Sequence, residues 1–227
     1  NFPISGLRLP PEMVRAYAHI KKAAAWTNAS LKRLPRRHAS AITRACDELL
    51  RGAFDDQMVV DVYQAGAGTS FNMNANEVIA NRANELLGAR KGTYRFIHPN
   101  DHVNMAQSTN DTFPTAMRVA CLTALPRLVE AMAQLETALR NNARRFDGVV
   151  KAGRTHLQDA VPVRLGREFG AYAVAVRKAR QDLAHASRAL GEVNLGGTAV
   201  GTGMNAHPRY RHLAIRCLRQ WTRLPLR

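Results

Sequence analysis

The sequence has few cysteines and lacks long apolar runs. Cys46, Cys121 and Cys217 are odd in number, and they lack the paired spacing of a zinc site or a redox motif. We therefore expect reduced, mostly buried thiols. No apolar run reaches the roughly 18 residues of a membrane span. The first nine residues lack a charged region followed by an apolar core, so we expect a cytoplasmic protein without a membrane partner.

Acidic residues are also scarce. The chain has 17 Asp and Glu against 33 Lys and Arg, which gives a net charge of +16. Such a charge balance is typical of proteins that bind nucleic acid, an anionic surface or an acidic substrate. The basic residues are scattered through helical patterns, and no aromatic residues alternate with them as on a single-strand-binding surface. We expect no nucleic-acid partner, and nucleic-acid binding stays a minor alternative that rests on charge alone.

Apolar residues recur every three or four positions along most of the chain, which is typical of amphipathic helices. Together with 46% hydrophobic residues, this periodicity predicts an all-α globular protein. The longest pattern starts at Asp111 or Thr112, where a polar cap precedes Pro114. The predicted helices span residues 10–28, 37–50, 72–87, 111–145 and 164–190.

The two longest predicted helices exceed a typical globular helix. About 30 residues at 1.5 Å per residue extend about 45–50 Å. So small a chain cannot cover such helices by itself, so they need partners in a helical bundle. We predict a mostly helical N-terminal domain over residues 1–110, and the first part of a long-helix bundle over 111–227.

Segments rich in Gly, Ser, Thr and Asn separate the helices and form the candidate site. They lie at residues 65–74, 98–111, 153–162 and 196–205. Hydroxyl, amide and backbone N–H groups at helix starts can converge on one anion. Each segment taken alone is more commonly a turn followed by a helix cap. It is their joint occurrence that favours a binding site.

Four blocks carry a resemblance to a known family. They are GAGTSFNMNANEVIANRANELLG (66–88), HPNDHVNMAQSTNDTFPTAMR (98–118), GRTHLQDAVP (153–162) and LGGTAVGTGMNA (195–206). In order and spacing they resemble successive blocks of the aspartase/fumarase superfamily, and the opening NFPISG resembles its early segment. Because the blocks are long and rich in polar residues, chance agreement is negligible.

The resemblance implies a homotetramer with a central bundle of long helices and active sites shared between three subunits. Members eliminate an amine or a hydroxyl group from a succinyl-type substrate to give fumarate, without a cofactor. A base removes a weakly acidic proton beside a carboxylate, and preorganised donors hold the resulting aci-carboxylate. The small dicarboxylate substrate is the expected ligand. No His, Asp and Glu cluster has metal-ligand spacing, so no metal site is expected.

The resemblance also assigns residues to roles. Thr69, Ser108 and Thr109 would bind the substrate carboxylate on which charge grows, and Asn110 would contact the amino group. Ser70 would be a further substrate-binding residue. Thr155 and His156 would bind the other carboxylate, with His156 the only residue here assigned a catalytic, orienting role. A second anion site would comprise His98, Asn100 and Asp101. Met105 replaces a lysine that many relatives have, which removes a cation beside that second site.

Subgroup identity depends on a few local choices. GAGTS with NMN, STND and LQDAVP are typical of the members that convert L-aspartate to fumarate and ammonia, as carbon–nitrogen lyases. His156 and the GGTAVGTG string fit the class II fumarate hydratases equally well, so hydration of fumarate to malate is the alternative.

The family's GSSxMPxKxNP loop, with its serine base and substrate-binding lysine, does not occur in these 227 residues. We therefore expect no lyase activity from this chain alone. A non-catalytic scaffold that retains only the assembly function is a second alternative.

Overall fold

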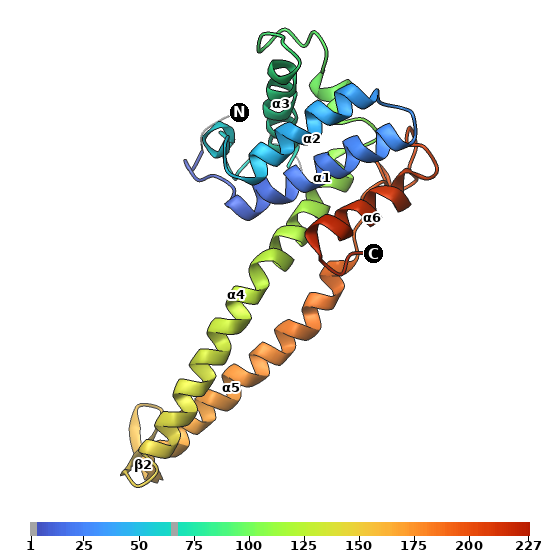
Figure 1. Cartoon of the computed structure of the whole chain (residues 1–227). Coiled ribbons are helices and arrows are strands. Elements are labelled where there is room, and N and C mark those ends of the chain that lie inside the picture. The colour runs from blue at the N-terminus through green and yellow to red at the C-terminus, as the bar shows by residue number, and fades with distance from the viewer. Residues whose placement is uncertain (1–3, 65–67) are drawn as a thin grey trace. The chain divides into compact units, whose positions relative to one another are not determined.

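The computed structural model describes residues 4–64 and 68–227, and it is predominantly helical (Figure 1). The chain forms two compact units. The first comprises Asn1–Thr123 with Leu190–Arg227, and the second comprises Ala124–Ala189. The all-α prediction is confirmed, whereas the domain division at residue 110 stays a prediction. No helix among the described residues is long and apolar enough to cross a membrane.

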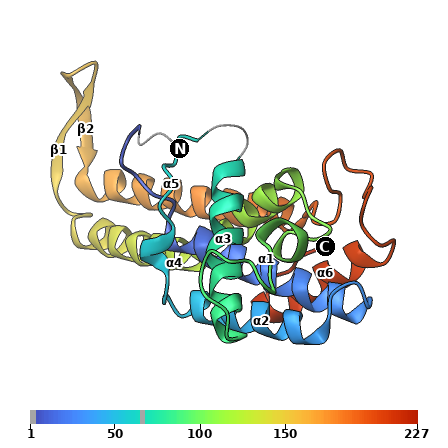
Figure 2. The ribbon, with the colours of Figure 1, turned by 90° about the horizontal axis from the view of Figure 1, so that it is seen from above.

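Helix α1 (Pro11–Ser30) is the centre of the first unit, and it contacts the other helices of its core (Figure 2). Its residues Tyr17, Ile20 and Ala24 are fully buried. The elements that surround it are α2 (Arg36–Leu50), η1 (Asp55–Gln57), α3 (Thr69–Leu86), the π-helical turn η2 (Pro99–Val103), the start of α4 (Thr109–Arg145) and α6 (Tyr210–Thr222). The predicted apolar stripes of α1, α2 and α3 are therefore the faces that form the core.

Helix α6 had not been predicted from the sequence. Its buried residues follow helical spacing, at Tyr210, Leu213, Ala214, Cys217 and Leu218. This face packs on α1, and the two helices also meet through the edge-to-face contact of Trp26 with Trp221, whose ring centroids are 6.5 Å apart. The apolar periodicity of residues 210–218 is present in the sequence, but the arginines between these residues make it hard to recognise.

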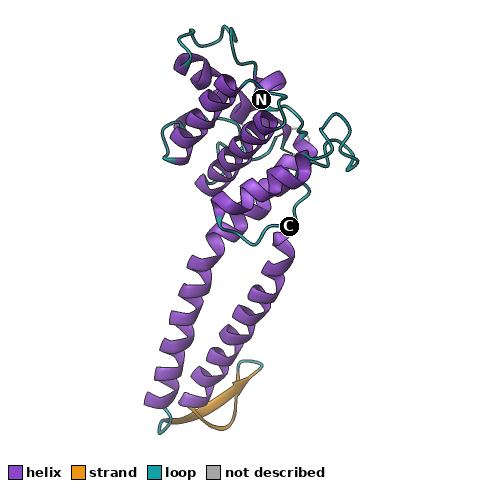
Figure 3. Cartoon of the chain, turned by 45° about the vertical axis from the view of Figure 1, so that its right-hand side comes forward, coloured by secondary structure: helices purple, strands orange, loops and turns teal. Residues whose placement is uncertain are grey.

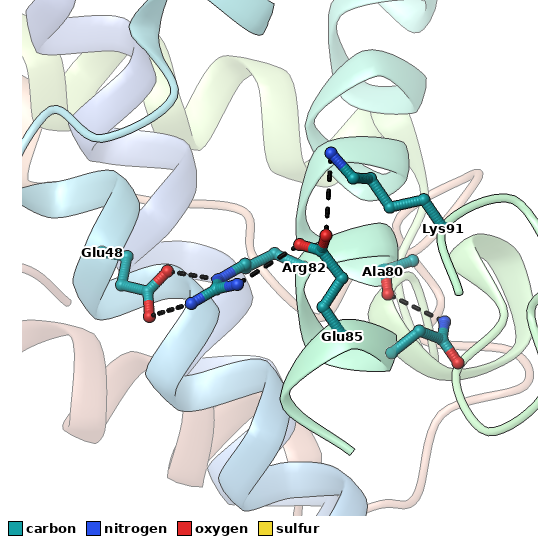
Figure 4. Close-up of polar contacts among 6 residues, drawn as sticks. Glu48, Ala80, Arg82, Glu85 and Lys91 are labelled. Atoms are coloured by element: carbon teal, nitrogen blue, oxygen red, sulfur yellow. Dashed lines mark hydrogen bonds and ion pairs between the residues drawn. The ribbon is translucent and has the colours of Figure 1, made fainter. Parts of the chain in front are cut away.

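A chain of ion pairs joins α2 to α3 (Figure 4). Arg82 on α3 contacts both carboxylate oxygens of Glu48 on α2, with Nε to Oε2 at 2.5 Å and Nη2 to Oε1 at 3.1 Å. Arg82 also reaches Glu85 at 3.3 Å, and Lys91 lies 3.6 Å from the same carboxylate. The hydrogen bonds and charge of Arg82 lower the pKa of Glu48, although partial burial opposes this. This cluster adds a charged contact to the apolar packing of α2 on α3.

The second unit contains the distal part of α4 and helix α5 (Leu165–Ala186), side by side and antiparallel (Figure 3). Phe146 and Phe169 pack with ring centroids 5.6 Å apart near one end. Farther along, the buried Glu136 accepts a hydrogen bond from Arg180 at 3.1 Å. A short 3₁₀ turn, η3 (Ser187–Gly191), follows α5. Both predicted long helices are therefore present.

The third polar segment, residues 153–162, is not an irregular connection between helices but most of a β-hairpin. Strand β1 (Val150–Thr155) pairs antiparallel with β2 (Gln158–Arg164). His156 and Leu157 form the two-residue turn, with φ of 49° and 62°. Two successive positive φ values match the twist of a tight hairpin, but such turns normally carry Asn or Gly. The turn therefore had no recognisable sequence signal.

Candidate active site

The start of helix α4 is a capping box. The Ser108 hydroxyl oxygen accepts a hydrogen bond from the Asn110 backbone N–H at 3.2 Å, and Asp111 Oδ1 accepts from the Ser108 N–H at 2.9 Å. This reciprocal pattern satisfies N–H groups that the first helical turn leaves without partners. The helix therefore begins at Thr109, earlier than the predicted start at Asp111 or Thr112. Ser108 and Thr109 lie where the helix dipole is positive.

Asp111 also holds the fourth polar block. Its other oxygen, Oδ2, accepts backbone hydrogen bonds from Gly196 at 2.9 Å and Thr198 at 3.0 Å. Burial raises the pKa of the Asp111 carboxyl group, and the three backbone N–H groups oppose that rise. Beside it, Asn110 donates to the Ala199 carbonyl at 2.7 Å. The second and fourth blocks, about 85 residues apart, are thus joined at one helix start.

The start of α3 lies against the start of α4. Gly68 has φ of +88°, and a Cβ atom there would fall inside the Phe113 ring, so only glycine fits. Thr69 is exposed and Ser70 is half-buried in the first turn. The Phe71 N–H donates to the Gln64 side chain at 2.7 Å. Residues 65–67, part of the GAGTS block, lie outside the described residues.

A buried lysine links these two helix starts. The Lys21 ammonium on α1 donates to the amide oxygens of Asn72 at 2.8 Å, Asn104 at 2.9 Å and Gln107 at 2.9 Å. Asn72 on α3 in turn donates through Nδ2 to the Thr109 hydroxyl oxygen at 3.1 Å. Lys21 is thus connected to a predicted substrate-binding residue through one side chain.

Lys21 is fully buried, which is uncommon for lysine. Burial lowers the pKa of its ammonium group to about 7, while the Asp111 carboxylate acts in the opposite direction. The three amide oxygens match the three N–H bonds of the charged form. A neutral amine would leave one of these oxygens without a donor, so the cluster itself favours the ammonium ion.

The structure brings the predicted residues of the first unit together. Thr69 and Ser70 begin α3, while Ser108, Thr109 and Asn110 lie at the start of α4, and the Asn72–Thr109 hydrogen bond joins the two helices. The other two predicted residues, Thr155 and His156, lie in the second unit on the hairpin, where both are exposed. Their convergence with the first group stays a prediction.

The residues of the predicted second anion site lie at the π-helical turn. His98 Nδ1 is 3.2 Å from Asp101 Oδ2, and its ring packs edge-on against Tyr94 with centroids 5.5 Å apart. Asn100 is exposed on the same turn. Asp101 therefore already supplies a negative charge to His98. Within the described residues, no group of three or more His, Cys, Asp or Glu residues could hold a metal ion.

Sequence reasoning missed several polar residues of this site. Lys21, Asn104 and Gln107 had not been assigned a role, and Asp111 had been assigned only as a helix cap. One signal was available for the lysine, since Tyr17, Lys21 and Ala24 recur at helical spacing on the buried stripe of α1. A lysine on such a stripe predicts a buried charge with specific partners.

The chain matches the model of the Lyase family over residues 4–227, and it belongs to that family. The predicted membership of the aspartase/fumarase superfamily is confirmed by relatives of both kinds. The chain is 49% identical to the aspartate ammonia-lyase of Bacillus subtilis (strain 168) over 226 residues, which are 100% of this chain and 48% of that protein. It is 50% identical to the class II fumarate hydratase of Thermus aquaticus over 221 residues, 97% of this chain and 47% of that protein.

Solved structures show the same fold. The chain superposes with a TM-score of 0.94 on the Brucella melitensis protein described as fumarate lyase:delta crystallin bound to cobalt, at 49% identity. That match covers 100% of this chain and 50% of the other. The Schistosoma mansoni class II fumarase gives a TM-score of 0.89 at 36% identity, over 98% of this chain and 47% of that one. The chain therefore spans about half the length of its relatives.

Proposed function

We propose that this protein is an ammonia-lyase that converts L-aspartate reversibly into fumarate and ammonia. The observation that carries the proposal is the cluster of hydroxyl and amide groups at the paired starts of α3 and α4. These groups are Thr69, Ser70, Ser108, Thr109 and Asn110, beside a buried ammonium group. A helix start with hydroxyl donors suits an anion whose charge grows during the reaction.

The chemistry places different demands on the two ends of the substrate. Proton removal beside the β-carboxylate creates an aci-carboxylate with two negative charges, so its donors must be preorganised. In this proposal Thr69, Ser108 and Thr109 hold that end, and Asn110 contacts the departing amine. Thr155 and His156, supplied from the hairpin, bind the α-carboxylate and orient the substrate. None of these steps requires a cofactor.

The resemblance to the superfamily implies active sites that are shared between subunits, so the proposal includes oligomerisation. We propose a homotetramer in which the exposed hairpin reaches a neighbouring subunit's helix starts, so that three subunits form each active site. Exposed apolar side chains on α4 and α5 support association. Leu128, Leu135 and Tyr172 are 52%, 51% and 56% exposed.

The alternative function is a class II fumarate hydratase, which adds water to fumarate to give malate. It is favoured by a 54% identity to the class II fumarate hydratase of Halobacterium salinarum over 215 residues, 94% of this chain and 46% of that protein. His156 fits this subgroup as well. Both activities use the same dicarboxylate scaffold, so residues around the departing group decide between them.

One assay separates the two activities. Fumarate absorbance is followed after the protein, as its gene encodes it, is mixed with L-aspartate or with L-malate. We expect fumarate to form from aspartate, with malate turned over at least about tenfold more slowly, a difference of about 1.4 kcal/mol in transition-state binding. Turnover of malate alone would replace the aspartase assignment with that of a fumarase.

The second alternative is a scaffold that binds dicarboxylates without turning them over. We propose instead that residues 1–227 supply part of the site and that a serine base outside them completes it. We expect no turnover from the 227-residue chain, and turnover once a segment bearing that base is joined to it. Robust activity from the 227 residues alone would place the base within this chain and contradict our assignment.

A further inference from the structure

The Asn72 side chain accepts a hydrogen bond from the buried lysine through its amide oxygen and donates one to Thr109, a predicted substrate-binding residue, through its amide nitrogen. We propose that Lys21 and Asn72 are positioning residues that fix the Thr109 hydroxyl as a hydrogen-bond donor to the substrate carboxylate. This inference rests on the proposed function, because it concerns the same dicarboxylate site.

The first step is the orientation of the Asn72 amide. A lysine ammonium can only donate, so it must face the amide oxygen and not the amide nitrogen. Lys21 Nζ lies 2.8 Å from Asn72 Oδ1, and the Thr112 hydroxyl lies 3.5 Å from the same oxygen. The Nδ2 group therefore occupies the other position of the amide, where it donates to Asn104 Oδ1 at 3.3 Å and to Thr109 Oγ1 at 3.1 Å.

The second step is the consequence for Thr109. The Thr109 hydroxyl oxygen accepts a hydrogen bond from Asn72, so the hydroxyl hydrogen remains free to be donated to another acceptor. Thr109 is half-buried at the first position of α4, where an anion is favoured by the helix dipole. If the amide were reversed, Thr109 would donate inward to Asn72 and present lone pairs to a carboxylate. The orientation of one buried amide thus decides whether Thr109 attracts or repels the substrate.

The rest of the cluster prevents that reversal. Gln107 Nε2 donates to the backbone carbonyls of Val103 at 3.0 Å and Met105 at 3.1 Å, so its amide oxygen is committed to Lys21. Asn104 Oδ1 accepts from both Lys21 and Asn72. With each oxygen facing a donor, a reversed Asn72 would place its NH₂ group against an ammonium group in a buried site, where unpaired donors are costly.

Replacing Asn72 by aspartate tests the inference while keeping a partner for Lys21. The Asn72→Asp carboxylate still accepts from the ammonium group, but it now also accepts from Thr109, whose hydroxyl turns inward. Succinate, a dicarboxylate that cannot eliminate ammonia, is the probe in titration calorimetry with the protein as its gene encodes it. We expect Thr109→Val to weaken succinate binding on the order of ten- to a hundredfold in the unsubstituted protein. In the Asn72→Asp background we expect the same Thr109→Val substitution to weaken succinate binding by less than about threefold.

A matched control separates orientation from general damage. Thr115→Val makes the same substitution farther along α4, at a buried hydroxyl that donates to the Asp111 carbonyl at 2.7 Å. Its effect on succinate binding should be equal in both backgrounds. Circular dichroism and thermal melting check that the Asn72→Asp protein folds. Lys21→Met is a poorer test because it leaves three amide oxygens without their lysine donor.

The outcomes are distinct. If Thr109→Val weakens succinate binding by the same factor in both backgrounds while the unsubstituted protein binds succinate, Asn72 does not orient the Thr109 hydroxyl. In that case only this inference is overturned. If the unsubstituted protein does not bind succinate at all, the proposed function is overturned and the inference falls with it.

Discussion

At the residue scale, one hydroxyl group on Ser108 can fill both a structural role and the proposed substrate-binding role. Its oxygen caps α4 by accepting from the Asn110 N–H, while its hydrogen is available to a substrate carboxylate. The sequence presented these roles as competing explanations. The capping box makes the first a structural fact, so loss of the hydroxyl must affect stability as well as chemistry.

We expect Ser108→Ala to lower kcat and kcat/KM together, on the order of 10²–10³-fold, because the lost donor acts mainly in the transition state. Loss of the cap costs about 1 kcal/mol, or about 2–4 °C in Tm for a chain of this size. Kinetics with the proposed substrate and thermal melting measure the two effects separately.

Two further variants separate the roles. Ser108→Asp keeps a good cap but places a negative charge beside the substrate, so it should melt near the wild-type temperature and still lose activity. Ser108→Thr keeps both groups and should retain most of the activity. A Ser108→Ala protein with lower Tm and near-normal kcat would show that Ser108 is a helix cap alone.

At the scale of elements, the contact between α2 and α3 depends on charge. Arg82 lowers the pKa of Glu48, so this carboxylate stays ionised to lower pH in the folded chain than in the unfolded one. A lowered pKa contributes stability above the unfolded pKa of about 4.3, and that contribution disappears as pH falls through the folded pKa.

We therefore expect Glu48→Gln to lower the free energy of unfolding by about 1 kcal/mol at pH 7, since both partners are less than a third exposed. Tm should fall by about 2–4 °C at pH 7, and the difference from wild type should disappear as pH falls through the lowered pKa of Glu48 in the folded chain. Melting curves across this range provide the measurement. The exposed Glu130→Gln is the control, and a pH-independent difference at Glu48 would mean that packing, not charge, is lost.

At the scale of the whole molecule, assembly is expected to follow from the exposed apolar side chains of the second unit. We expect the protein to sediment as a tetramer, and Leu128→Asp with Leu135→Asp to shift it to smaller species. Thr137→Asp, on the same helix at an exposed position, should leave the tetramer intact. Analytical ultracentrifugation decides this, and an unchanged mass for the double variant would exclude this face of α4 from the interface.

The sequence by itself determined the helices and the family. Apolar spacing located α1 to α3 because each buries one stripe, and it located α4 and α5 although Leu128, Leu135 and Tyr172 stay exposed on them. The four polar blocks identified the superfamily because their residues are poor helix formers that helix formation does not explain. The site residues of the first unit followed from the same blocks. Residue choices within these blocks favoured aspartase over fumarase but did not exclude fumarase, because both subgroups share the scaffold that the blocks describe.

The tertiary structure alone decided how distant residues connect. Lys21 meets Asn72, Asn104 and Gln107 across 51, 83 and 86 positions of sequence, and Asp111 meets Gly196 across 85. No periodicity or local motif encodes such pairings, since they arise only when α1, α3 and α4 pack together. The hairpin turn at His156 and Leu157 depends on backbone angles that its residues seldom adopt. Hydrogen-bond direction, which makes Thr109 a donor, is likewise a property of the packed cluster and not of any residue in it.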